Sequence, residues 1–151
     1  VMVDYPAPHT EQLILELSRQ ETLKTASQTI AKIDQATLFT ARQQVLQVHM
    51  SEPVEAYLVQ IILATRNSSD YGGDLADWLD YGASPRATIA LDRCSRALAW
   101  LDNRDYVKTA DVHSVAHDIL RHRLILSFEA ETAGDSAHRV THFLLRAVQL
   151  A

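Results

Sequence analysis

The spacing of glycine and proline is the strongest constraint on how this 151-residue chain can fold. The chain has only four of each residue, below the ~12% that the two together average in proteins. They occur at a few places, and the runs between them are rich in alanine and leucine, which is typical of helices joined by loops. Together with a hydrophobic content of 47%, this pattern argues against disorder and against a turn-rich β-sandwich. We therefore expect one compact helical domain.

Apolar residues at helical spacing predict an all-α bundle of about six helices. The expected helices cover about residues 8–20, 34–47, 51–66, 84–102, 109–123 and 135–150. Asp34, Ser51, Ser84 and Thr109 are suited to cap four of them. Residues 70–83 are expected to form one or two helical turns within a long connection, and residues 21–33 have no clear period. Residues 124–129 fit either an extended segment or a helical continuation, and no second extended segment is expected inside the domain.

Residues 1–7 are expected to be a separate element. Val1–Tyr5 has an extended pattern that stops at Pro6. A lone apolar strand has no partner to pair with, so we interpret it as the end of a strand from another domain upstream. The expected division is residues 1–7 as this strand stub and residues 8–151 as the helical domain.

Charge and cysteine content bear on partners and location. The net charge is −5 and the chain has three lysines, so no basic surface for nucleic acid is expected. No apolar run approaches the ~18 residues of a membrane span, so no membrane association is expected. Cys94 is the single cysteine and no signal-like segment opens the chain, which favours the cytoplasm. Cys94 falls on an apolar stripe, where we expect a small buried side chain rather than a nucleophile.

The segment Gly82-Ala-Ser-Pro-Arg-Ala87 is the strongest candidate for chemistry. It places Arg86 in the first turn of a helix, where the helix dipole disfavours a cation by about 0.3–1 kcal/mol. An anion would resolve this conflict, because backbone N–H groups at a helix start and a guanidinium both bind phosphate oxygens. Ser84, Pro85, Arg86 and Ala87 are therefore candidate residues for half of a phosphate site. The alternative is a surface arginine that pairs with an acid such as Asp80, and spacing alone leaves both open.

Several separated motifs together resemble the lid of MoxR-type AAA+ ATPases. In chain order they are Val3-Asp-Tyr-Pro6, Ala64-Thr-Arg66, Tyr81-Gly-Ala-Ser-Pro-Arg-Ala87, Arg104-Asp-Tyr-Val107, Asp111-Val112 and His122-Arg-Leu124. The resemblance covers almost the whole chain. It implies that Arg86 is the sensor-2 arginine, which reaches the γ-phosphate of ATP held with Mg²⁺ by a neighbouring P-loop domain. It also implies a ring, expected to be a hexamer, that remodels client enzymes in a chaperone-like way with von Willebrand factor A-type partners.

The chain departs from that family in lacking the nucleotide-binding half. No Gly-Lys pair occurs, so the phosphate-binding motif Gly-x-x-x-x-Gly-Lys-Ser/Thr is absent, as are the Walker B acids and their strand core. We therefore interpret the chain as a C-terminal lid fragment. The full-length protein is expected to hydrolyse ATP, whereas the fragment alone is expected to be non-catalytic and to hold no cofactor.

The sequence offers two other interpretations. His113 and His117, and likewise His138 and His142, stand four residues apart, so each pair could face one metal ion. Neither pair has a third ligand set by the sequence, and the first lacks the glutamate of a zinc protease, so no metal is expected. The second alternative is a stand-alone helical adaptor that binds a partner helix in an exposed groove. The apolar stub at the start of the chain argues against the adaptor.

Overall fold

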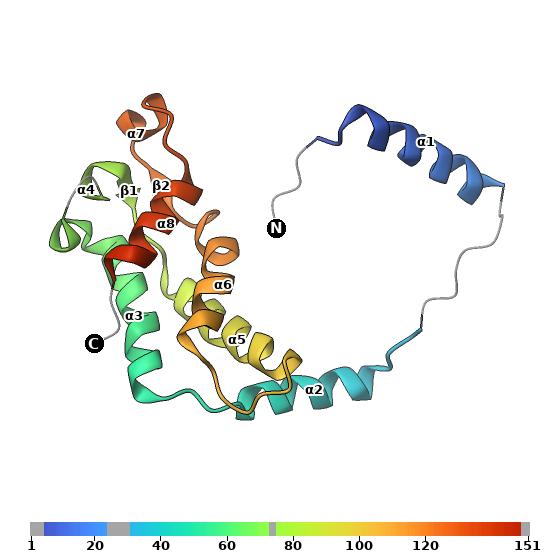
Figure 1. Ribbon diagram of the computed structural model, residues 1–151, viewed down its shortest axis with the longest axis horizontal. Helices are drawn as coiled ribbons and strands as arrows, with labels where there is room; N and C mark the ends of the chain where they lie inside the picture. Colours follow the sequence, from blue (N-terminus) through green and yellow to red (C-terminus); the bar gives the residue numbers. More distant parts are fainter. Residues whose placement is uncertain (1–4, 24–30, 73–74, 149–151) are drawn as a thin grey trace. The chain divides into compact units, whose positions relative to one another are not determined.

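The computed structural model describes residues 5–23, 31–72 and 75–148 (Figure 1). The chain divides into two units, residues 1–37 and 38–151. Most of the predicted strand stub, residues 1–4, lies outside the described residues, and residues 5–7 have no regular secondary structure. The division at residue 7 therefore stays a prediction.

The first unit contains α1 (Pro8–Thr22), which is close to its predicted range. Pro8 occupies the start of the helix, Glu11 lies in the first turn and Arg19 in the last, an arrangement that suits the helix dipole. No residue of α1 is buried within the described chain. The next helix, α2 (Gln35–Gln47), begins after Asp34, whose Oδ1 accepts a hydrogen bond of 2.6 Å from the Thr37 amide. This contact confirms the predicted cap.

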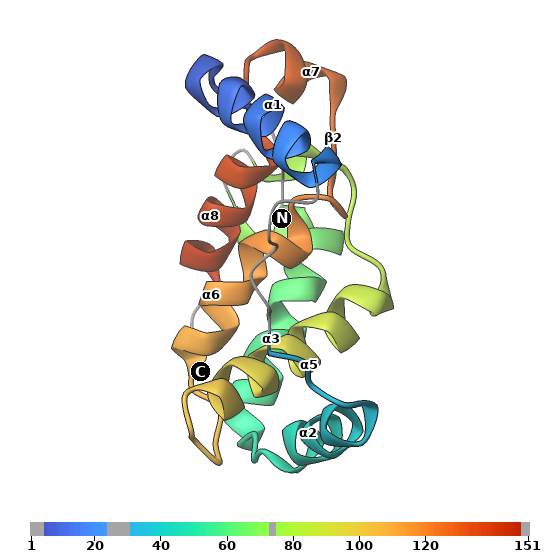
Figure 2. The same cartoon turned by 90° about the vertical axis from the view of Figure 1, so that its right-hand side faces the viewer.

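Four helices form the body of the second unit. They are α3 (Glu52–Arg66), α5 (Pro85–Leu101), α6 (Thr109–Leu120) and α8 (Ala137–Ala147) (Figure 1). α5 packs against α3 and α6, and α8 packs against α3 and α6; Figure 2 shows α6 and α8 side by side. The facing side chains include eight that are almost fully buried: Leu58, Ile61, Ile62, Leu91, Leu120, Leu144, Val112 and Val140. The predicted all-α bundle is confirmed.

Short elements gather at one end of this unit. They are the 3₁₀ turn η1 (Ser68–Tyr71), α4 (Leu75–Trp78), β1 (Leu79–Tyr81), β2 (Ile125–Leu126) and α7 (Phe128–Thr132) (Figure 1). β1 and β2 pair antiparallel, with Leu79 opposite Leu126 and Tyr81 opposite Ile125. The expectation of no second extended segment was therefore wrong, because a strand of two or three residues is too short to show a period of two. The open choice for residues 124–129 resolves into strand β2 followed by the start of α7.

The buried face of α5 is narrower than predicted. Its buried residues are Ala87, Leu91, Ser95 and Ala99, all four apart, whereas Cys94 is exposed. The prediction of a buried Cys94 was wrong, because each residue turns the helix by about 100° and Cys94 lies one position away from the fully buried row. No helix among the described residues has the length and apolar character required to cross a membrane.

Candidate functional site

The N-terminus of α5 presents Arg86 to solvent. Ser84 is the N-cap residue in extended conformation, Pro85 follows it, and the Ala87 amide donates to the Ser84 carbonyl at 2.8 Å. Ser84, Pro85 and Arg86 are exposed and Ala87 is buried. Neither the Ser84 hydroxyl nor the Arg86 guanidinium bonds to any part of the chain that the structure describes. The alternative pairing of Arg86 with Asp80 is not found there, so the guanidinium is available to an external anion.

The loop that leads to α5 is held by the last residues of α3. The Thr65 hydroxyl accepts a hydrogen bond of 2.9 Å from the Ala83 amide and donates one of 2.7 Å to the Ile62 carbonyl. Arg66 Nε donates to the Ala83 carbonyl at 2.8 Å. Both polar backbone groups of the buried Ala83 are therefore satisfied by two consecutive side chains. This pair lies in the motif at residues 64–66, which sequence analysis matched to a family but to which it gave no role.

Gly82 allows this loop to lie directly on α3. A Cβ at position 82 would stand 2.3 Å from the Thr65 carbonyl oxygen and 2.6 Å from its carbon. These are backbone atoms, so a side chain there would have to push the loop and the end of α3 apart. The structure thus joins two motifs about 17 residues apart in the chain, Ala64–Arg66 and Tyr81–Ala87, into one local unit.

The motifs Arg104–Val107 and Asp111-Val112 together build a separate structural corner at the other end of α5. Arg104 donates from Nη1 to Asp111 Oδ2 at 2.8 Å and from Nη2 to Asp111 Oδ1 at 2.7 Å. The Lys108 amide also donates to Asp111 Oδ2, at 2.7 Å, so this carboxylate starts α6. The predicted cap was Thr109; instead Lys108 is the N-cap residue and Thr109 is the first helical residue, because the Asp111 carboxylate reaches back to the amide before it.

The ion pair between Arg104 and Asp111 shifts the pKa values of both side chains. Burial acts to raise the pKa of Asp111, but the hydrogen bonds from Arg104 and the Lys108 amide outweigh it, and the pKa is lowered. The same hydrogen bonds with Asp111, and one with Asp102, raise the pKa of Arg104. Both groups are therefore charged at neutral pH, and their role is to hold the turn between α5 and α6.

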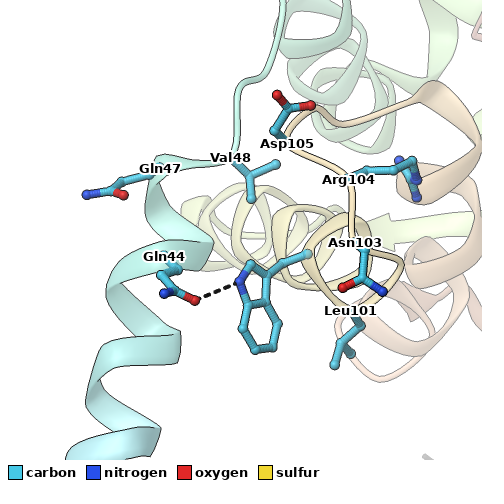
Figure 3. Close-up of a pocket in the computed structure, with 8 residues that line it drawn as sticks. Gln44, Gln47, Val48, Leu101, Asn103, Arg104 and Asp105 are labelled. Atoms are coloured by element: carbon cyan, nitrogen blue, oxygen red, sulfur yellow. Dashed lines mark hydrogen bonds between the residues drawn. The ribbon is translucent and has the colours of Figure 1, made fainter.

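A pocket lies beside this corner, between α2 and the connection from α5 to α6 (Figure 3). Gln44 accepts a hydrogen bond of 3.1 Å from Trp100 Nε1 across it. The other residues that line the pocket are Gln47, Val48, Leu101, Asn103, Arg104 and Asp105. Leu101 is fifteen residues from Arg86 along α5, or about 22 Å at 1.5 Å per residue. The pocket is thus remote from the candidate phosphate site.

The histidines meet in a different combination from the predicted pairs. His117 of α6 stacks with His138 and His142 of α8, with ring centroids 4.5 and 6.5 Å apart, and His113 contacts the Tyr57 hydroxyl at 2.5 Å. Burial, followed by the charges of His138 and His142, lowers the pKa of His117. Within residues 5–23, 31–72 and 75–148, no group of three candidate ligands is arranged to hold a metal ion.

Comparison with known proteins defines the class of this helical unit. Residues 76–147 match the family model described as the AAA lid domain. A crystal structure of a Cytophaga hutchinsonii protein thought to be an ATPase is 34% identical, with a TM-score of 0.85. That similarity covers 99% of this chain and 45% of the other. The unit is therefore an AAA lid domain.

Several of the relatives are MoxR proteins. The chaperone MoxR1 of Mycobacterium tuberculosis is 32% identical over 99% of this chain, and the protein MoxR of Paracoccus denitrificans is 34% identical over 52% of it. YeaC of Bacillus subtilis, an uncharacterised protein, is 30% identical over 97%. The chain belongs to the MoxR-type AAA+ family. It spans 39%, 25% and 42% of the lengths of MoxR1, MoxR and YeaC respectively.

Proposed function

We propose that Arg86 is a sensor-2 arginine that acts on ATP bound, with Mg²⁺, by a P-loop domain outside this chain. One observation carries the proposal: the Arg86 guanidinium has no partner in the described chain, although it stands where the helix dipole disfavours a cation. Such a group fits a phosphate oxygen, because a guanidinium donates two parallel hydrogen bonds and helix N-termini favour anions.

The position of Arg86 on α5 supports two roles, one in phosphoryl transfer and one in coupling nucleotide state to the orientation of the lid. ATP supplies the phosphoryl group, and the chain would supply one positive charge toward the oxygens on which negative charge develops during transfer. α5 carries Arg86 and packs along α3 and α6, so a force on its first turn is passed to the whole helical unit. Nucleotide state would thereby change the orientation of the lid.

The wider biology follows from the family and forms part of the same proposal. We place the full-length protein in a ring of subunits, a hexamer, that remodels client enzymes in the cytoplasm together with von Willebrand factor A-type proteins. The chain itself is non-catalytic in this proposal, because the residues that hold and cleave ATP belong to the other domain.

The test is ATP hydrolysis by the full-length protein carrying Arg86→Ala. Loss of one well-placed donor in a reaction of this type costs about 10²-fold in kcat. Arg86→Lys is expected to recover part of the loss, because a lysine keeps the charge but not the paired hydrogen bonds. Arg93→Ala is the matched control, since Arg93 is also exposed on α5 and should leave the rate unchanged. Wild-type hydrolysis by Arg86→Ala would show that the assignment is wrong.

A further inference from the structure

The last turn of α3 controls the loop from which Arg86 projects. Ala83 immediately precedes the N-cap residue Ser84, so the orientation of the two peptide groups that flank Ala83 sets the direction in which α5 begins. Thr65 binds its N–H at 2.9 Å, and Arg66 Nε binds its C=O at 2.8 Å. These two contacts fix the two peptide groups that flank the Ala83 Cα, one through its N–H and the other through its C=O.

The Thr65 hydroxyl is itself oriented. Its proton is directed to the Ile62 carbonyl at 2.7 Å, which leaves the oxygen lone pairs to accept from the Ala83 amide. The side chain is 2% exposed and lies in an apolar core beside Ile61 and Ile62, where valine would fill the same space. The core would therefore accept valine at position 65, whereas the hydroxyl is required by the loop.

Arg86 depends on this loop because nothing else in the described chain holds it. Its guanidinium forms no hydrogen bond or ion pair there, so its position is set by its backbone alone. The backbone is fixed on one side by the buried Ala87, and on the other by Ala83 and by Gly82, which has no room for a Cβ. A displacement of about 1 Å at such a group can cost about 10²-fold in rate.

We propose that Thr65 and Arg66 are positioning residues for Arg86, and that they make the end of α3 and the start of α5 move as one body. The inference rests on the proposed function of Arg86. It assigns the Ala64–Arg66 motif to the phosphate-sensing unit, rather than to general stability of the bundle.

The experiment measures kcat and KM for ATP in the full-length protein carrying Thr65→Val, with Thr65→Ser as the matched variant. Valine keeps the volume but removes the hydroxyl, whereas serine keeps the hydroxyl. We expect Thr65→Val to lower kcat about 10-fold with KM changed less than about twofold, and Thr65→Ser to stay within about twofold of wild type. Arg66→Met should act like Thr65→Val, and Arg66→Lys, which retains a donor, should recover part of the rate.

The decisive comparison is made in an Arg86→Ala background. If Thr65 acts through Arg86, adding Thr65→Val to Arg86→Ala causes no further loss. If the double variant instead loses kcat by the product of the two single losses, the inference is overturned. A wild-type kcat for Thr65→Val when Arg86→Ala is slow would overturn it as well. If Arg86→Ala itself hydrolyses ATP at the wild-type rate, the proposed function fails and this inference falls with it. Should Thr65→Val fail to fold, the Arg66→Met and Arg66→Lys pair supplies the same comparison in the same background.

Discussion

One guanidinium that contacts two carboxylates allows the effect of burial on an ion pair to be measured within one protein. Arg104 binds Asp111 through two hydrogen bonds of 2.7 and 2.8 Å, and binds Asp102 through one of 3.0 Å. The Asp111 side chain is 7% exposed and that of Asp102 is 59% exposed. The perturbation is Asp111→Ala, and Asp102→Ala is its control.

The expected magnitudes differ because water can replace only one of the two carboxylates. Removing one partner of a buried ion pair costs about 3–5 kcal/mol. We take about 2–3 kcal/mol for Asp111→Ala, because Arg104 is 17% exposed and solvent screens part of the loss. The Lys108 amide also loses its acceptor at the start of α6. Asp102→Ala removes a solvent-exposed contact and should cost less than about 1 kcal/mol.

Urea unfolding and thermal unfolding of the chain, both followed by its helical circular dichroism, provide the assay. For a chain of this size the expected loss in Asp111→Ala lowers Tm by about 4–12 °C, against about 0–4 °C for Asp102→Ala. The lowered pKa of Asp111 adds a signature: its stabilisation is present above the unfolded-state pKa of 3.8 and is lost as the pH falls below it. Equal destabilisation by the two alanine variants would refute the reasoning from burial.

Four further outcomes are expected. Leu91→Ala, at a fully buried position of α5, should destabilise the chain by about 3–5 kcal/mol in urea unfolding, whereas Leu101→Ala, 67% exposed on the same helix, should change stability by less than about 0.5 kcal/mol. Arg86→Ala should stabilise the chain by about 0.3–1 kcal/mol, because it removes a cation from the positive end of a helix, and a lower Tm would contradict this. Gly82→Ala should cost about 1–3 kcal/mol, since its Cβ meets backbone, and an unchanged Tm would show that the loop does not pack on α3 as described. His117 has a pKa below its unfolded value of 6.5, so the unfolded state binds more protons and Tm should fall as the pH drops below that value; a smaller fall in His117→Gln is the check.

Much of the bundle was predictable from local pattern. In the helix expected at about residues 51–66, six residues recur at helical spacing, and α3 buries all of them: Val54, Tyr57, Leu58, Ile61, Ile62 and Thr65. The prediction succeeded there because α3 packs against several elements, so its apolar face is wide. The prediction failed at Cys94, which lies one position from the fully buried Ser95, because a difference of one position turns a side chain to solvent.

The candidate site divides in the same way. Ser84 to Ala87 were identified from the sequence because a cation at a helix start is a local conflict that can be read from neighbouring residues. The part played by Thr65 and Arg66 could not be read in this way, because it depends on contacts between residues 17 or 18 positions apart. The same limit applies to His117, whose ring neighbours belong to another helix.

The sequence by itself determined the helices, the cap at Asp34 and the unusual position of Arg86, since each depends on the spacing of residues within a few turns. Tertiary structure decided which motifs work together. The motif at residues 64–66 joins the loop before Arg86, whereas Arg104 and Asp111 hold a turn at the far end of α5. The physical reason is that backbone amides and charged side chains are satisfied by whichever groups packing brings near, and packing joins residues without regard to their separation in the chain.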